Sequence, residues 1–433
     1  MKPKTRNLRR QTCNLKLGSL RRTLAAVCLA SLAACGGQQS QEGKPRLLVL
    51  NVGTLPSDRQ LWEDAVALFK TDHPDCVVDV RHHKDDDYTK LHLPQALRSR
   101  HRPDIYFQWA GFAVHRDGGG GIARDLTAEF DAAWREQHDE RAFRGTTHGG
   151  KYFMIPVSMD VSNVLWYRKS ILAKHGIEPP RTWEAFVEAC KKLKAAGVTP
   201  IVHGNQAGWP AGNWAAHMAE TYLGIETYDA IGDPKSPARV PLDDPRIVKA
   251  VALLEELARL GAFNEDINTL DNNEGTGLFN RGAGAFHFDG GWIIEEFVEP
   301  DDVGLLRQPV LPGDVADPDS ILATASGYMI HARSPHPDLA LELLRAYTAL
   351  PIQKKAVEIG RMSTIKAALK SAKTPHQRAV LDLLAKSSTW VAAPDISWRP
   401  ADAEEFNRAV AAVVGGRATA LEALRAAAKN IAR

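Results

Sequence analysis

Tryptophans that stand beside glycine, proline and polar residues are the side chains of this sequence best suited to hold a ligand. Of ten tryptophans, five fall at expected strand ends or connections: Trp109, Trp209, Trp214, Trp292 and Trp398. A flat indole face suits the apolar C–H face of a pyranose ring, and nearby Asp and Asn side chains can bond its hydroxyls. For Trp214 and Trp398, packing between two parts of the fold is an equally good interpretation. Trp183, by contrast, has the helical spacing of a core residue.

Catalytic and metal-binding motifs are missing from the sequence. It has no Gly-x-Ser-x-Gly, no His-Glu-x-x-His, no phosphate-binding glycine loop and no Cys-x-x-Cys. The His/Asp run at residues 82–87 resembles a metal cluster by composition, but neighbouring strand residues point to opposite faces and no later histidine is suitably spaced. We therefore interpret it as a solvated strand end, and we expect no catalytic residue, no metal site and no cofactor.

The N-terminus has the pattern of an export signal. Residues 1–34 hold eight basic and no acidic residues, and the apolar run from Leu24 to Leu32 is shorter than the ~20 residues that a membrane-spanning helix needs. The run ends in Leu32-Ala33-Ala34-Cys35, which resembles a bacterial lipobox with Cys35 as the lipidation site. We expect residues 1–34 to be removed and residues 35–45 to form a flexible tether. An ordinary cleaved signal followed by a coincidental cysteine is the alternative.

Charge and cysteine content narrow the class of partner. The full chain carries a net charge of +2, but beyond residue 34 it has 46 basic and 52 acidic residues. A mildly acidic surface argues against nucleic acid as a partner. Beyond Cys35 only Cys76 and Cys190 remain, too few for a disulfide framework, and we expect both to be buried.

Strands and helices alternate after the tether. Strands are expected at 47–52, 77–80 and 105–107, with helices between them. This β-α-β-α-β order predicts a parallel sheet whose ligands bind at the carboxyl ends of the strands, here Gly53-Thr54 and Gln108-Trp109. Helices dominate from residue 152 onward, and strands return at 285–288 and 327–330. A length that exceeds one core, with this late return to strand, predicts an α/β protein of two lobes.

Several segments resemble the extracellular solute-binding proteins of ABC sugar importers. The likeness covers nearly the whole chain after the tether and is carried by residues 152–160, 165–170 and 176–186, by Asp289-Gly290-Gly291-Trp292, and by 416–419 before a C-terminal helix. Arg168 stands where that family usually has Asn, and Phe286 where it usually has Met. These departures leave the fold expectation intact but make a specific sugar harder to name.

The resemblance implies a periplasmic-binding-protein fold, with two discontinuous α/β lobes and a ligand cleft between them. The N-lobe would comprise 46–155 and 327–362, and the C-lobe 156–326 and 363–433, joined by hinge segments near 154–160, 324–328 and 361–365. Carried over by position, the expected ligand-binding residues are Trp109, Asp160, Trp209, Asn213, Trp292, Asp289, Thr54 and Tyr328. Trp214 and Trp398 join them as tryptophans at expected connections or strand ends. Asp289 could instead hold the Gly290-Gly291 turn.

The resulting hypothesis is an exported receptor, anchored through a lipid on the periplasmic or cell-surface side of the membrane. It would be a non-enzymatic monomer that binds a mono- or oligosaccharide and delivers it to the transmembrane subunits of an ABC permease. A receptor of the same fold for a polyamine or a phosphate ester is one alternative, which a cleft lined by carboxylates, or by Arg and Lys, would favour. An exported carbohydrate-active enzyme is the other, with Asp160 and Asp289 as candidate carboxyls by residue type alone.

Overall fold

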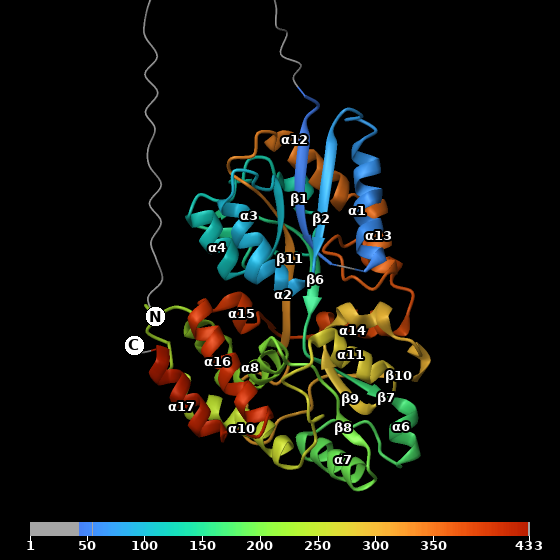
Figure 1. Cartoon of the computed structure of the whole chain (residues 1–433), viewed down its shortest axis with the longest axis vertical. Helices are drawn as coiled ribbons and strands as arrows, with labels where there is room; N and C mark the ends of the chain where they lie inside the picture. Colours follow the sequence, from blue (N-terminus) through green and yellow to red (C-terminus); the bar gives the residue numbers. More distant parts are fainter. Residues whose placement is uncertain (1–42, 54, 432–433) are drawn as a thin grey trace, which may run out of the picture. The chain divides into compact units, whose positions relative to one another are not determined.

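The first expected strands belong to a six-stranded sheet whose strands β1 and β2 lie in the upper half of Figure 1. The computed structural model describes residues 43–53 and 55–431, so residues 1–34, Cys35, most of the expected tether and Thr54 lie outside the described residues. The strand order is β12 (Trp390–Val391), β11 (Ile321–Ile330), β3 (Ile105–Trp109), β1 (Arg46–Val52) and β2 (Val77–His83), with β6 (Ile155–Val161) also pairing with β11. β1 is parallel to both β2 and β3, as the β-α-β-α-β order predicts. The carboxyl ends of these three strands therefore share one edge.

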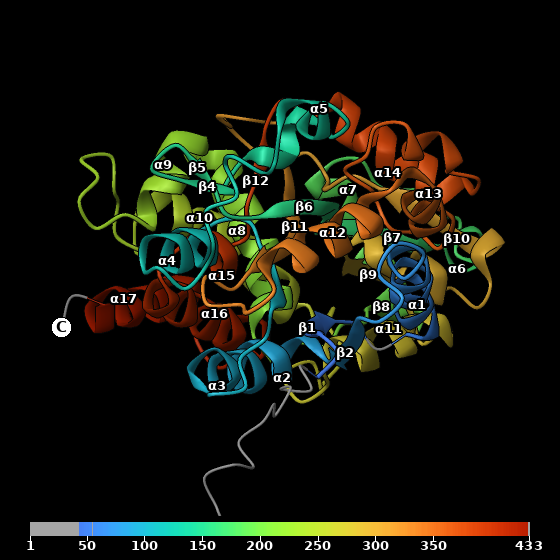
Figure 2. The same ribbon diagram turned by 90° about the horizontal axis from the view of Figure 1, so that it is seen from above.

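Helices cover both faces of this sheet, and Figure 2 shows α1 and α3 on either side of β1 and β2. On one face, α1 (Pro56–Phe69), α12 (Pro337–Thr348) and α13 (Leu350–Glu358) share a core with Ile105 and Tyr328. On the other face, Tyr88 and Leu93 pack with Tyr106. Those two residues belong to the run α2 (Asp85–Asp87), η1 (Tyr88–His92) and α3 (Leu93–Arg98). The next elements along the chain are α4 (Phe112–Gly119), α5 (Ala132–Arg135), η2 (Glu140–Phe143), β4 (Thr147–His148) and β5 (Lys151–Tyr152).

A second, four-stranded sheet lies in the lower half of Figure 1. Its order is β10 (Val303–Leu306), β7 (Val164–Arg168), β9 (Gly284–Asp289) and β8 (Thr199–Ile201). β7 is antiparallel to both of its neighbours, whereas β8 and β9 are parallel. From Pro45 onward the chain forms one compact unit that contains both sheets.

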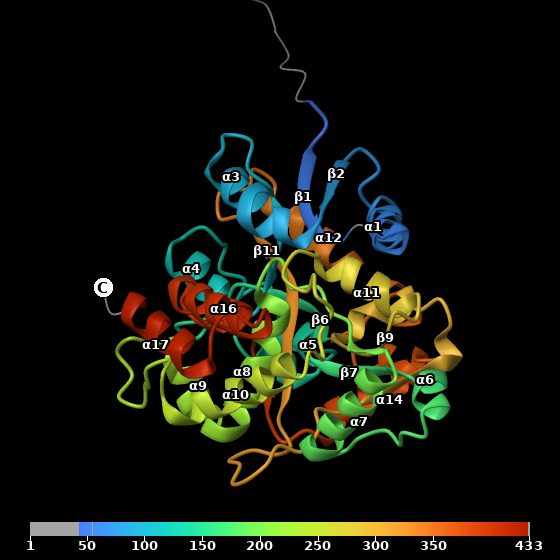
Figure 3. The same cartoon turned by 60° about the horizontal axis from the view of Figure 1, so that its bottom comes forward.

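The second sheet carries most of the remaining helices, and α8, α10, α16 and α17 lie side by side in Figure 3. Before β11 the chain adds α6 (Lys169–Lys174), α7 (Trp183–Ala195), α8 (Trp209–Leu223), α9 (Ile225–Ile231), α10 (Pro245–Arg259), α11 (Asn272–Asn280), η3 (Gly291–Glu296) and η4 (Pro300–Asp302). After α13 come η5 (Ala368–Ser371), α14 (Pro375–Lys386), α15 (Pro394–Ser397), α16 (Pro400–Val414) and α17 (Ala420–Ile431). Thr182 caps α7 by accepting a hydrogen bond from the Ala185 N–H, and Trp183 is buried, as its spacing predicts.

Segments far apart in the sequence run between the two sheets. β6 and β11 run from the upper to the lower half of Figure 1, and a third segment at 362–364 lies beside β6. There the Met159 N–H donates to the Met362 carbonyl (2.7 Å), and the Thr364 N–H donates to the Val157 carbonyl (3.2 Å). These are the segments that the sequence analysis expects to join two lobes.

One local expectation is wrong: residues 208–214 are not a connection. Trp209 opens the 15-residue helix α8, with Pro210 in its first turn. Proline is tolerated there because the first N–H groups of a helix have no partner within the helix. Gly212 is needed for packing, since a Cβ at this position would lie 2.0 Å from Oδ1 of Asn407. The glycines and proline thus serve the start of a buried helix.

Two further observations bear on the chain's class. Cys76 and Cys190 are both buried and unbridged, as expected. Within residues 43–53 and 55–431, no helix has the length and apolar character needed to span a bilayer.

Candidate functional site

Strand register places two of the expected site residues on one face of the first sheet. In β11, Ser326 lies opposite Trp109 of β3 and also opposite Ser158 of β6, while Thr324 lies opposite Asp160. Residues opposite each other in antiparallel strands point to the same face, as do residues two apart in one strand. Trp109 and Asp160 therefore face the same side, and Trp109 is only half-buried.

Asp160 is held by hydroxyl groups on that face. Its Oδ1 accepts a hydrogen bond from Ser158 Oγ at 2.7 Å. Burial raises the pKa of Asp160 above its ordinary value, although hydrogen bonds from Ser326 and Ser158 and the charge of Arg361 act in the opposite direction. Solvent still reaches part of the side chain, so the carboxyl group can accept hydrogen bonds from a ligand.

Trp292 and Trp209 form a second half-exposed group next to the second sheet. Their ring centroids are 6.3 Å apart with the ring planes at 62°. The ring of Trp292 lies directly over Gly290, where a Cβ would come within 2.2 Å of it. The Trp166 indole N–H donates to the Gly290 carbonyl at 3.2 Å, which fixes the turn that carries Trp292.

Asp289 makes hydrogen bonds on this turn, the arrangement expected if it holds the turn, which is one of the two alternatives that the sequence leaves open. It is buried, and its Oδ1 accepts from the Gly290 N–H at 2.7 Å. Its Oδ2 accepts from Asn272 Nδ2 at 3.0 Å and from Thr276 Oγ1 at 3.2 Å. These bonds occupy the carboxylate within the protein.

Four other expected site residues are buried. Trp214 is 1% exposed and stacks on Phe288 with centroids 3.5 Å apart, and Trp398 is equally buried. Tyr328 donates from its hydroxyl to Asn51 Oδ1 at 2.6 Å, inside the core under α1. Asn213 is buried in α8. For Trp214 and Trp398 the structure favours the packing alternative, and we leave all four residues out of the ligand surface proposed below.

Carboxyl groups that the sequence analysis passed over gather at the end of β2. Burial, with the charges of Asp395 and Asp86, raises the pKa of Asp85 to about 7. Asp395 on α15 is an exposed residue, yet desolvation by nearby protein atoms together with the charge of Asp86 raises the pKa of its carboxyl to about 6. Asp85 follows the carboxyl end of β2 directly, so the rule that singled out Thr54 and Trp109 would also have found it.

Arg361 connects the two groups of candidate residues. It lies at the start of the third connecting segment, and its Nη1 donates to the Trp292 carbonyl at 3.1 Å. Its charge also acts on Asp160. Trp109 and Asp160 on the first sheet, and Trp292 and Trp209 beside the second, thus border one region of the molecule. We call these four residues the candidate ligand surface.

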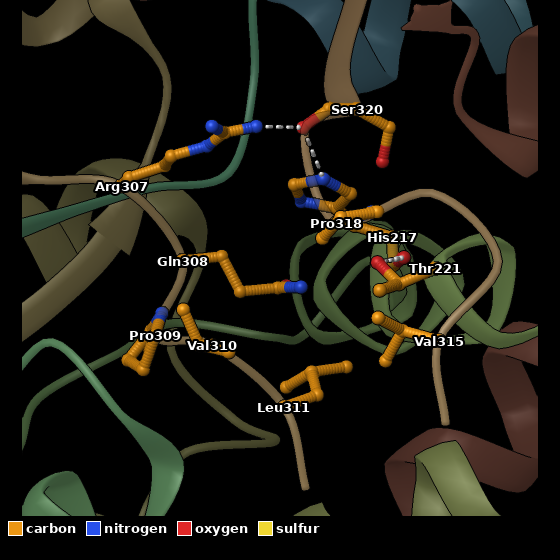
Figure 4. A pocket seen from close by; sticks show the side chains of 10 residues that line it. All are labelled: His217, Thr221, Arg307, Gln308, Pro309, Val310, Leu311, Val315, Pro318 and Ser320. Carbon is orange, nitrogen blue, oxygen red and sulfur yellow. Dashed lines mark hydrogen bonds between the residues drawn. The ribbon is translucent and has the colours of Figure 1, made fainter. Parts of the chain in front are cut away.

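Two cavities in the described part of the chain are lined by none of these four residues. One of about 290 Å³ is bordered by the start of α4, by β11 and by α15, and the ion pair of Arg144 and Asp229 (2.5 Å) lies on its wall. The other, of about 20 Å³, is the pocket in Figure 4, where His217 and Arg307 both converge on the Ser320 carbonyl. The smaller pocket has room for about one water molecule, not for a sugar ring.

Comparison with known proteins agrees with this architecture. The sequence profile of the family described as bacterial extracellular solute-binding protein matches residues 53–354. An uncharacterised ABC transporter extracellular-binding protein of Pyrococcus horikoshii is 27% identical over 65% of this chain, which spans 64% of that relative's length. The melibiose/raffinose/stachyose-binding protein MelE of Bacillus subtilis is 23% identical over 72% of each chain.

Solved structures share the fold across almost the whole described chain. A structure from work on xylan utilization by Caldanaerobius polysaccharolyticus has a TM-score of 0.82 at 22% identity and covers 89% of this chain and 100% of its own. Maltose-bound MalE3 of Thermotoga maritima has a TM-score of 0.73 at 20% identity, over 89% of this chain and 99% of its own. The fold is thus the α/β fold of periplasmic binding proteins, and this chain belongs to the family of bacterial extracellular solute-binding proteins, whose members bind solutes and are not enzymes.

Proposed function

We propose that this protein binds a carbohydrate outside the cytoplasm and delivers it to an ABC importer. The observation that carries the proposal is the pair of half-exposed aromatic groups, Trp109 on one side and Trp209 with Trp292 on the other, with the Asp160 carboxyl between the sheets. Indole faces provide stacking surfaces for sugar rings, and a carboxyl group accepts hydroxyl hydrogen bonds. The relatives MelE, a melibiose/raffinose/stachyose-binding protein, and maltose-bound MalE3 give further support to a carbohydrate ligand.

The proposal includes two lobes that close on the ligand. We assign residues 46–155 and 327–362 to one lobe and 156–326 and 363–433 to the other, because the connecting segments cross between the sheets within these bounds. Ligand would bind between the lobes, and closure would bring Trp109 and Trp292 to opposite sides of it.

A lipid anchor on Cys35 is a separate part of the proposal and rests on the sequence alone. Stable anchoring takes more than one acyl chain, as the lipobox resemblance implies. Fractionation of cells expressing the Cys35→Ala variant tests it: the variant should leave the membrane fraction with its ligand affinity intact, and continued membrane retention would overturn the anchor.

A second candidate ligand class, a cationic solute such as a polyamine, is favoured by the carboxyls of Asp85, Asp86 and Asp395. A bound cation would stabilise the ionised carboxyls, and it would lower the raised pKa values of Asp85 and Asp395. A phosphate ester has less support, because Arg361 is already paired with Asp58. Affinity that rises steeply from pH 5 to pH 8 would indicate the cationic class, whereas a neutral sugar should bind with little change.

A thermal-shift screen decides between the classes. We would test melibiose, raffinose, maltotriose, xylotriose, chitotriose, galactose, spermidine and glucose 6-phosphate, each followed by calorimetric titration. A ligand that binds only the folded state stabilises it by about 2.7 kcal/mol at a hundredfold excess over Kd. A shift with at least one saccharide supports the proposal, and a shift with spermidine or glucose 6-phosphate alone overturns it.

A further inference from the structure

We infer that Arg361 is a positioning residue for ligand binding, which ties the loop after β1 to the backbone of Trp292. Its guanidinium is the point where the first sheet's edge, the third connecting segment and the turn after β9 meet. The inference rests on the proposed function, because it assumes that Trp292 contacts the ligand. The bonds that carry it do not depend on which ligand binds.

On the side of the first sheet, Arg361 braces the loop through Asp58. Arg361 Nη2 donates to Asp58 Oδ1 at 2.6 Å. The other carboxylate oxygen, Oδ2, accepts from the Leu55 N–H at 3.3 Å. It also lies against Gly53, where a Cβ would come within 2.6 Å of it. Asp58 thus holds the chain on both sides of Thr54, at the carboxyl end of β1.

On the side of the second sheet, Arg361 holds the turn that presents Trp292. Its Nη1 donates to the Trp292 carbonyl at 3.1 Å. We call the contacts of Arg361 with Asp58 and with the Trp292 carbonyl the junction. Two neighbouring contacts reinforce it: Ser57 Oγ donates to Glu295 Oε1 at 2.5 Å, and Gly360 lies against Ile294. The start of α1 and the helix η3 therefore meet around a single guanidinium.

The guanidinium of Arg361 stays charged, and its planar shape lets it form two bonds in different directions. Burial works to lower the pKa of Arg361, but the charges of Asp58, Glu295 and Asp160 outweigh it and raise the pKa. Each terminal nitrogen bonds a different element, which the planar fork of arginine permits. A lysine at this position could replace the charge but could not keep both directed bonds.

The test compares Arg361→Gln, Arg361→Lys and Asp58→Asn with the control Arg239→Gln. Arg239 is matched because its side chain is 22% exposed against 21% for Arg361, and because it too pairs with an aspartate, the buried Asp402. That pair lies among helices that pack on the second sheet. Spin labels at the exposed positions Lys70 and Lys174, introduced as cysteines, report the separation of the two sheets in the ligand-free protein.

The expected result is specific to the junction. Arg361→Gln and Asp58→Asn should each lengthen or broaden the label distance of the ligand-free protein and, with raffinose as the probe, weaken binding about tenfold through faster dissociation. The two changes should not add in the double variant, and Arg361→Lys should restore the label distance only in part. Arg239→Gln should lower the melting temperature and leave distance and affinity unchanged.

Two outcomes distinguish a failure of this inference from a failure of the proposed function. If Arg361→Gln leaves the label distance as in the wild type and only lowers the melting temperature, the inference is overturned whatever ligand binds. If raffinose and every other saccharide fail to bind while the label distance responds as expected, the junction stands and the sugar proposal fails.

Discussion

Trp209 and Trp214 lie five positions apart on the same helix, yet only one of them is available to a ligand. Trp209, in the first turn of α8, is half-exposed and meets Trp292, whereas Trp214 is 1% exposed and stacks on Phe288. Both have the same glycine- and proline-rich neighbours in the sequence. Because one side of a helix terminus is open, an indole at the first position of a helix can face a ligand, whereas an indole little more than one turn further along lies in the core.

Core truncation should have the largest effect. Trp214→Ala removes a buried indole from the core that it shares with Trp183 and Phe288, so it should lower the free energy of unfolding by about 3–5 kcal/mol. Denaturant unfolding measures this change, with Trp183→Ala as the matched control. The ligand affinity of the remaining folded protein should be unchanged. A stable Trp214→Ala variant with weakened binding would show that Trp214 serves the ligand rather than the core.

Truncation at the candidate ligand surface should act on binding instead. Trp109→Ala and Trp292→Ala should each weaken binding by about 1–3 kcal/mol, which is about ten- to a hundredfold in Kd, from lost apolar area and ring stacking. Calorimetric titration with the saccharide that gives the largest thermal shift provides the measurement. Wild-type affinity in both variants would show that the four-residue surface is wrongly assigned.

A smaller effect on binding is expected at the buried turn. Asp289→Asn keeps the shape of a side chain that accepts hydrogen bonds from Gly290 and Asn272, but it puts an amide where a carboxylate now accepts. Because these bonds hold the turn before Trp292, we expect loss of stability with a modest decrease in affinity. Melting curves and titrations of the same preparation check this. A loss of affinity as large as that of Trp292→Ala, without loss of stability, would instead identify Asp289 as a ligand contact.

The smallest expected effect is a pH dependence of stability from Asp85, because solvent reaches part of this residue and screens its interactions. Its pKa is about 7 in the folded protein, against about 3.9 for an unperturbed aspartate. Between these values the folded state holds a proton that the unfolded chain has released, so the contribution of Asp85 to stability is present below about pH 4 and is lost as the pH rises toward 7. Asp85→Asn should therefore gain in melting temperature relative to the wild type between pH 4 and pH 8. Parallel curves for the two proteins would argue against a raised pKa.

Much of the fold follows from the sequence because its signals are local. The alternation of strands and helices up to residue 107 predicts the parallel pairing of β1 with β2 and β3, and the helical spacing around Trp183 predicts its burial. The helix at Trp209 was missed for a local reason too, because glycine and proline at a helix start look like a connection.

The site is less accessible to sequence reasoning because its contacts are distant along the chain. Arg361 bonds Asp58 across 303 positions and Trp292 across 69, and no spacing rule links such residues. Asp85 lies near a strand end, but the composition of the run at 82–87 favours a solvated strand end over a binding site. Burial of Tyr328 and Trp398 depends on helices that pack from other parts of the chain.

The most direct test of the central claim is fluorine NMR of the protein labelled with 5-fluorotryptophan, titrated with the saccharide that gives the largest thermal shift. Single Trp→Phe variants assign the signals. We expect the largest changes in chemical shift at Trp109, Trp209 and Trp292, with the signals of Trp183, Trp214 and Trp398 nearly unchanged. Largest changes at Trp214 or Trp398, with Trp109 and Trp292 silent, would contradict it.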